Sequence, residues 1–140
     1  MIIADTGLWV ALFDRRDRYH TAAAKRLASL DEPLITTIPV ITEACYLLQT
    51  HAGQDYACTF LAAQPKGLFR LATFDGAILA RAEPLMRRYA NLPMDFADAS
   101  LVLLAEELGH GRILSTDQRD FETYRWKQRH PFENLLAPDP

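Results

Sequence analysis

The chain has 140 residues, of which 49% are hydrophobic and 24% are charged, as in an ordinary globular domain. Its formal net charge of −3 does not indicate a general nucleic-acid binder. No apolar run approaches the roughly 20 residues that span a bilayer, and the N-terminus lacks the basic leader of a signal peptide. We therefore expect one domain over residues 1–140, with no membrane segment.

The two cysteines, Cys45 and Cys58, fall in segments with helical spacing and form no C-x-x-C pair. Buried free thiols explain them better than a disulfide or a zinc site. Free thiols persist in a reducing compartment, so we expect a cytoplasmic protein.

In the first half of the chain, two strands each lead into helices. Residues 1–5 form a short apolar strand that ends at Asp5, and Thr6 is a suitable N-cap for the helix that follows it. Pro39 opens a later helix that ends near Gly53. The strands are expected at 1–5 and 32–37, and the helices at 6–14, 19–30, 39–53 and 55–65.

The second half continues this alternation. Pro84 is expected to kink or break one helix, and Gly109 and Gly111 are expected to end the next. Residues 117–121 are expected to form a loop. The strands are expected at 67–74 and 111–116 with an edge strand within 131–140, and the helices at 75–92 and 95–109.

Strands that alternate with helices predict βαβ units in an α/β fold: a central, mainly parallel sheet of about five strands, covered by helices on both faces. Ligands of such sheets bind beyond the carboxyl ends of the strands. Acidic residues lie at or near this edge in four stretches. They are Asp5, Glu43, Asp95 with Asp98, and Asp117 with Asp120.

Each acid also has a structural explanation. Asp5 could cap the helix after it, and Asp95 is better explained as an N-cap than as a catalytic residue. The helix dipole would stabilise Asp98 near an N-terminus, and Asp117 could stabilise a turn. Glu43 has the weakest such explanation, because a mid-helix carboxylate beside apolar neighbours must be paired or exposed.

Taken together, the acids favour a metal site. Clustered carboxylates repel one another, and a divalent cation removes that repulsion. A ligand set of oxygens without His or Cys suits Mg²⁺ or Mn²⁺. Such an ion can join protein carboxylates to a substrate phosphate and activate a water. The pattern therefore predicts metal-dependent hydrolysis of a phosphodiester.

Four motifs in this order resemble the PIN-domain family, and specifically the VapC-type toxins of type II toxin–antitoxin pairs: "IIADTGLWVALF", "PVITEACYLL", "DFADASLVLLAEELG" and "ILSTDQRDF". The resemblance covers nearly the whole chain in the order and length of its elements. It implies a PIN-like three-layer α/β/α fold and a Mg²⁺- or Mn²⁺-dependent endoribonuclease. It also implies an RNA substrate, a cognate VapB-like antitoxin and a homodimer.

By the same resemblance, Asp5, Glu43 and Asp98 match the catalytic acids of the family, and Asp117 matches the fourth. Asp5, Asp98 and Asp117 would hold the metal, and Glu43 would orient or deprotonate the attacking water. Because the closing motif varies in spacing, Asp120 competes with Asp117, which is favoured because it directly follows the strand.

The supporting positions are less specific. Thr6 and Ser115 match hydroxyl residues that help to hold the site, and Asp95 matches only a subset of the family. Arg15, Arg16 and Arg119 are expected to steer the RNA backbone, an assignment made only from their proximity in sequence.

Three other classes of protein share part of this acidic pattern. A haloacid-dehalogenase-type phosphatase requires a second Asp where this chain has Gly7, and a receiver-like domain requires a lysine after a late strand, where none is found. The third is a PIN-like module that binds RNA or a partner without cutting, and only an assay separates it from a nuclease. The sequence does not reveal the RNA target.

Overall fold

The computed structural model describes residues 1–136, so the last four residues of the expected C-terminal edge segment lie outside the described part. Five strands form one sheet in the order β3-β2-β1-β4-β7, and every neighbouring pair is parallel. This arrangement confirms the predicted parallel sheet. The strands are β1 (Ile2–Ala4), β2 (Leu34–Thr37), β3 (Phe69–Ala72), β4 (Arg112–Leu114) and β7 (Glu133–Asn134).

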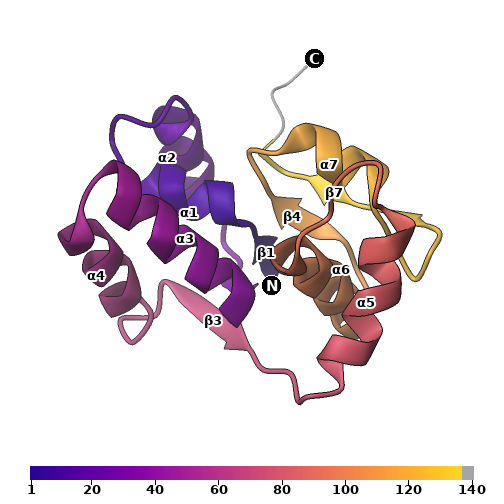
Figure 1. Ribbon diagram of the computed structural model, residues 1–140. Coiled ribbons are helices and arrows are strands. Elements are labelled where there is room, and N and C mark those ends of the chain that lie inside the picture. The colour runs from indigo at the N-terminus through magenta and orange to yellow at the C-terminus, as the bar shows by residue number, and fades with distance from the viewer. Residues whose placement is uncertain (137–140) are drawn as a thin grey trace.

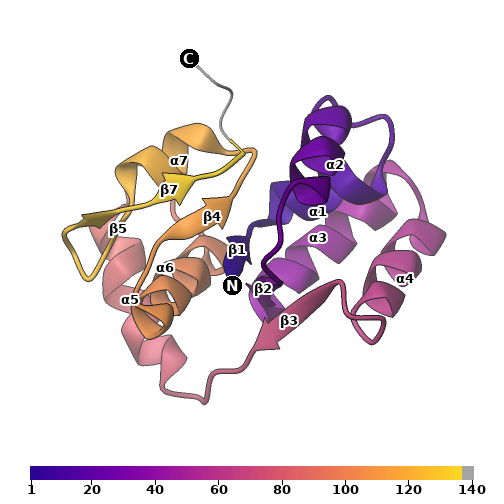
Figure 2. The same ribbon diagram turned by 180° about the vertical axis from the view of Figure 1, so that it is seen from behind.

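Helices flank the sheet on both sides, which confirms the α/β/α architecture (Figure 1). The first group, with α3 and α4 outermost, is α1 (Thr6–Phe13), α2 (His20–Ala28), α3 (Ile38–His51) and α4 (Gln54–Ala63). The second group, on the other side of β1, is α5 (Ile78–Arg88), α6 (Phe96–Leu108) and α7 (Gln118–Thr123). Viewed from behind, a small hairpin of β5 (Arg125–Trp126) and β6 (His130–Pro131) lies beside α5 and α6 (Figure 2).

The apolar side chains of β1 are completely enclosed, because strands lie on both of its edges and helices lie on both of its faces. The helix α6 is also unusually buried: its residues 99–105 are all buried. This central position explains why its apolar pattern is nearly continuous rather than restricted to one stripe. The N-terminus of α6 is therefore fixed against the sheet.

Aromatic side chains form two separate clusters. In the first, which we call the Trp9 cluster, Trp9 lies 5.3 Å from Phe60 and 4.8 Å from Phe69 between ring centroids, and Phe13 packs on Phe60. In the second, the Tyr124 cluster, Tyr124 contacts Tyr89 and Phe121 edge to face, and Phe121 contacts Phe132. Edge-to-face pairs of this kind stabilise a core beyond the area that they bury.

The start of α1 lies very close to the segment after β4. A Cβ atom on Gly7 would lie only 1.8 Å from the Thr116 hydroxyl oxygen. Because glycine has no side chain, the first turn of α1 can pack against this segment. The close approach brings Asp5, at the end of β1, next to Ser115 and Asp117.

Several local predictions were wrong. Asp5, not Thr6, is the N-cap of α1, since Asp5 has extended backbone angles and its side chain accepts a hydrogen bond from the Thr6 N–H. Residues 118–123, most of which were expected in a loop, form α7, with Asp117 as its N-cap. The helix α5 continues through Pro84, so the break that was expected there as the alternative to a kink does not occur. Cys58 is exposed rather than buried, although both cysteines are free as expected.

Gly109 ends α6 as predicted, with a left-handed φ of 76°. The hairpin of β5 and β6 was not predicted. Its turn contains Lys127 and Gln128, both with positive φ, where Gly or Asn would have been the recognisable signal.

Candidate active site

The carboxylate of Asp5 is almost fully buried and is held at both oxygens. Oδ1 accepts a hydrogen bond from the Thr6 N–H at 2.7 Å, and Oδ2 accepts one from the Ser115 hydroxyl at 2.7 Å. The Ser115 oxygen in turn accepts from the Asp117 N–H at 2.9 Å. Ser115 therefore connects the carboxyl ends of β1 and β4, and it sets the position of Asp117 relative to Asp5.

The polypeptide on either side of Asp5 is fixed by further contacts. The Asp5 N–H donates to the carbonyl of Leu114 at 3.1 Å, and the Thr36 hydroxyl donates to the carbonyl of Ala4 at 2.9 Å. A buried hydroxyl pair, Thr37 and Ser100 at 2.7 Å, joins the end of β2 to α6. These bonds fix the edge of the sheet from which the acids project.

Asp95 and Asp98 form a capping box at the start of α6. Asp95 Oδ1 accepts from the Asp98 N–H at 2.8 Å, and Asp98 Oδ2 accepts from the Asp95 N–H at 3.3 Å. Asp95 is thus the N-cap of α6, which confirms the explanation that the sequence favoured for this residue. The same arrangement holds the Asp98 carboxylate in a defined position.

Glu43 lies on the second turn of α3 and lines an open hollow of about 470 Å³ together with Asp95. The rest of the wall is largely apolar and includes Ile38, Tyr46 and Phe96. Ile38 and Tyr46 are 54% and 66% exposed, so a substrate or partner has direct access to this wall. Glu43, on α3, and Asp95, at the start of α6, therefore line the same open hollow.

Burial raises the pKa of Asp5 from 3.8 to about 6. The hydrogen bonds from Ser115 and Thr6 oppose this rise, and the nearby charges of Asp117 and Asp95 add to it. These charges act on Asp5 because carboxylates that are distant in sequence lie near one another in the fold.

Asp98 and Glu43 are perturbed further. The pKa of Asp98 is raised to about 8 by burial and then by repulsion from Asp95 and Asp5. The pKa of Glu43 is raised to about 7 by burial, by its contact with Asp95 and by the charge of Asp5. The Thr6 hydroxyl partly offsets the rise at Glu43, although the geometry falls short of a hydrogen bond.

Asp117 and Asp120 both belong to this group. The Asp117 side chain accepts from the Asp120 N–H at 3.2 Å and caps α7. Burial, the contact with Asp117 and the charge of Asp5 raise the pKa of Asp120 to about 6. Since both acids interact with Asp5, the competition between them for the fourth position stays open.

Tyr124 is a site residue that the sequence analysis missed. Its side chain is fully buried, and its hydroxyl donates to Asp98 Oδ2 at 3.4 Å. Burial raises its pKa, and the charges of Asp98, Asp120 and Asp117 raise it further, so the hydroxyl keeps its proton. No local pattern marks this tyrosine, because it meets the acids only when the segment after α7 folds back against α6.

The three arginines lie in different places. Arg119 is on α7 next to Asp120, and its charge opposes the rise in that residue's pKa. Arg16 instead bonds Asp14 and the carbonyl of His51, at the far end of α3 from Glu43. Arg15 is exposed in the same loop as Arg16. Their expected contact with RNA stays a prediction.

The chemistry of the acid group suits a hard divalent cation. The donors are carboxylates, and the buried Thr6 hydroxyl beside them has no hydrogen-bond partner within the described residues. Burial and mutual repulsion disfavour the charged forms of these acids, and a cation would reverse that effect. Within residues 1–136, however, no three acidic, histidine or cysteine side chains already converge closely enough to hold an ion. Binding of a cation would therefore require these acid side chains to move closer together.

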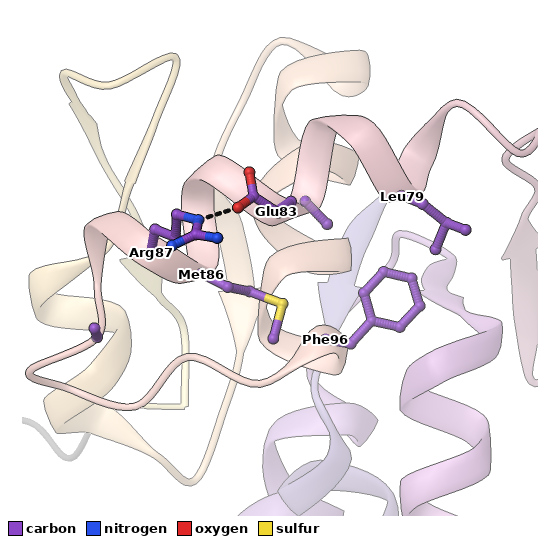
Figure 3. Close-up of a pocket in the computed structure, with 7 residues that line it drawn as sticks. Leu79, Glu83, Met86, Arg87 and Phe96 are labelled. Carbon is purple, nitrogen blue, oxygen red and sulfur yellow. Dashed lines mark hydrogen bonds and ion pairs between the residues drawn. The ribbon is translucent and has the colours of Figure 1, made fainter.

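A further pocket, of about 440 Å³, lies between α5 and the start of α6 (Figure 3). Leu79, Met86 and Phe96 line it, and the ion pair of Glu83 with Arg87 borders it. It contains none of the acids with raised pKa values. The pocket is therefore an apolar surface hollow beside the site rather than a second reaction centre.

Comparison with known proteins places the chain in a family. The PIN domain family model matches residues 2–127, so the chain belongs to the PIN-domain family. This finding confirms the resemblance that the four motifs indicated.

Two relatives from Mycobacterium tuberculosis are similar to this chain. Ribonuclease VapC26, of strain ATCC 25618 / H37Rv, is 29% identical over 124 residues, which are 89% of this chain and 92% of that protein. The crystal structure of VapC20, described as a sarcin-ricin loop cleaving toxin, matches with a TM-score of 0.79 and 22% identity. That match covers 85% of this chain and 92% of the VapC20 chain, and it supports the fold.

Within residues 1–136, no helix is long and apolar enough to cross a membrane.

Proposed function

We propose that the protein is a metal-dependent endoribonuclease and the toxin of a type II toxin–antitoxin pair. The observation that carries this proposal is that Glu43, Asp98 and Asp117 each lie near enough to Asp5, at the carboxyl edge of the sheet, for their charges to interact with it. Membership of the PIN-domain family and the similarity to a VapC ribonuclease support it. The open hollow that Glu43 lines gives an RNA strand access to the acids.

Asp5, Asp98 and Asp117 would hold Mg²⁺ or Mn²⁺, with Asp120 as the competing fourth acid. When bound, the cation would neutralise the carboxylates and lower the pKa of a coordinated water. Ser115 and Thr6 fix the Asp5 carboxylate, so one ligand is already oriented before metal binds. Asp95 acts as a supporting residue that keeps Asp98 in place through the capping box.

Glu43 would accept the proton of the attacking water. A general base is most effective when its pKa lies near the working pH, and that of Glu43 is raised to about 7. The water oxygen would bond to phosphorus while the bond from phosphorus to the 3′ oxygen breaks. The products would be a 5′-phosphate and a 3′-hydroxyl, with the proton passing to the 3′ oxygen.

The same proposal includes a cognate VapB-like antitoxin, a homodimer and action in the cytoplasm. An antitoxin would neutralise the toxin while the two proteins are bound. The exposed wall of Ile38 and Tyr46 beside Glu43 is accessible to a macromolecule.

Cleavage of end-labelled total RNA by the antitoxin-free protein tests this function. We expect cutting with Mg²⁺ and with Mn²⁺, no cutting in EDTA, and no cutting by the Asp98→Asn variant in either metal. Circular dichroism should first show that the variant is folded, since Asp98 also takes part in the capping box. The matched control is Asp55→Asn, in the first turn of α4, which should cut like the wild type.

A folded wild-type protein that cuts no RNA in either metal would contradict the nuclease. Calorimetric titration with Mn²⁺ on the same sample would then test whether the protein binds the metal at all. A protein that binds no Mn²⁺ would be a PIN-like module that binds RNA or a partner without cutting.

A further inference from the structure

Tyr124 has a buried hydroxyl whose contact is with one of the acids. Its side chain is inaccessible to solvent, and among the described residues the hydroxyl makes its hydrogen bond with Asp98 Oδ2, at 3.4 Å. A buried hydroxyl that lacks a hydrogen-bond partner costs free energy. The position of the ring places the Tyr124 hydroxyl beside Asp98, and the contact avoids this cost. An ionised carboxylate can only accept hydrogen bonds, so the Tyr124 hydroxyl is the donor once Asp98 is deprotonated, as it would be when it binds a cation.

The ring of Tyr124 is held firmly. Its centroid lies 5.0 Å from that of Tyr89 and 5.3 Å from that of Phe121, and both contacts are edge to face. The next residue is also fixed, because the Arg125 N–H donates to the Tyr89 hydroxyl at 3.1 Å. The position of the Tyr124 hydroxyl oxygen is thus set by the packing of the ring and does not depend on Asp98.

The two oxygens of Asp98 are used unequally. Oδ2 accepts from the Tyr124 hydroxyl at 3.4 Å and from the Asp95 N–H at 3.3 Å, and both distances are long for hydrogen bonds. Within residues 1–136, Oδ1 accepts no hydrogen bond. The two donors on one oxygen restrain the rotation of the carboxylate, and Oδ1 remains without a hydrogen bond among the described residues.

We infer that Tyr124 is a positioning residue: its hydroxyl holds Asp98 Oδ2 so that Oδ1 is presented to the divalent cation. This inference rests on the proposed function, because it assumes that Asp98 is a metal ligand. Partners that orient a metal ligand from behind typically contribute about 10-fold to 100-fold in metal affinity. The contact is long, so we expect an effect near the lower limit.

The test is a calorimetric titration of antitoxin-free protein with Mn²⁺. The variant is Tyr124→Phe, which keeps the ring contacts with Tyr89 and Phe121 and removes only the hydroxyl. The matched control is Tyr89→Phe, which removes a hydroxyl from the same cluster and leaves the Arg125 N–H without its partner. We expect Tyr124→Phe to raise the Kd for Mn²⁺ about 10-fold and Tyr89→Phe to leave it within about twofold of wild type.

A second readout separates positioning from a general loss of structure. In RNA cleavage, Tyr124→Phe should need about 10-fold more Mn²⁺ for half-maximal rate and should reach nearly the wild-type rate at saturation. The thermal midpoints of both variants, measured in EDTA, should be similar.

An unchanged Kd in Tyr124→Phe, or an equal loss in Tyr89→Phe, overturns the inference while the proposed function stands. A wild-type protein that binds no Mn²⁺ overturns both. The two failures are therefore distinguishable in one set of titrations.

Discussion

The two clusters both consist of aromatic side chains, but one lies in the apolar core and the other lies beside the acids. The Trp9 cluster joins α1, α4 and β3, and its rings pack against one another in the apolar core. The Tyr124 cluster lies behind α6 and α7, where the acids are, and its central ring carries a hydroxyl that reaches Asp98. The comparison teaches that burying a ring and orienting a carboxylate are separate tasks: Trp9 and Phe60 pack in the core, whereas Tyr124 packs and also reaches Asp98.

The largest effect on stability is expected from Phe60→Ala in the Trp9 cluster. Phe60 is inaccessible to solvent and contacts Trp9, Phe13 and Phe69, so its loss creates a cavity. We expect a loss of about 3–5 kcal/mol in the free energy of unfolding. Urea denaturation measures this loss. The Kd for Mn²⁺ of the folded protein should stay at the wild-type value, and a weaker affinity would show that the clusters are coupled.

Phe121→Ala should have a mixed effect. Phe121 holds Tyr124 and Phe132 edge to face, so its removal creates a cavity and also releases the Tyr124 ring. We expect a loss of about 3 kcal/mol in the free energy of unfolding. Unlike Phe60→Ala, it should weaken Mn²⁺ binding at least as much as Tyr124→Phe does. Urea denaturation and calorimetry on the same preparation check both results. Full Mn²⁺ affinity in this variant would argue that the ring has no part in orienting Asp98.

A third expected effect is a pH dependence confined to the acids. In the folded protein, the pKa values of Asp5 and Asp98 are raised from 3.8 to about 6 and about 8. Raised pKa values mean that the folded state binds protons more tightly than the unfolded state. The resulting stability is present below the unfolded pKa and is lost as pH rises through the folded values.

The thermal midpoint in EDTA should therefore fall as pH is raised from about 5 to about 8. Saturating Mn²⁺ should reverse this trend, because the cation binds the ionised carboxylates. Differential scanning calorimetry at several pH values measures both curves. Phe60→Ala should lower the midpoint by a similar amount at each pH, whereas Asp98→Asn should flatten the curve in EDTA. A wild-type curve that is already flat would show that the acids are not mutually destabilising.

Elements with strong local signals could be predicted from the sequence. The apolar runs of the strands, Pro39 near the start of α3 and Gly109 after α6 each reflect a local requirement, and all were located within a few residues. The failures were elements with weak signals. The helix α7 is only six residues long and polar, and the turn at Lys127 and Gln128 uses residues that rarely adopt a positive φ.

Thr6 and Asp5 show how a correct motif can still give a wrong local detail. Both residues are good N-caps, and the sequence cannot choose between neighbours that differ by one position. The close approach of Gly7 to Thr116 fixes the first turn of α1 and makes Asp5 the cap. Capping was thus one of the explanations that the sequence offered for Asp5, but the sequence could not choose between Asp5 and Thr6 as the cap.

The sequence by itself determined the fold class, the family and the acids proposed for the site, because strand periodicity, helix caps and the four motifs are local patterns. The tertiary structure alone decided what those acids contact. Ser115 bonds Asp5 across 110 positions of the chain, and Tyr124 reaches Asp98 from 26 positions away. Neither contact has a local signature, because each depends on where the parallel strands and the segment after α7 come together. Their physical origin is packing, which brings together donors and acceptors that the sequence keeps apart.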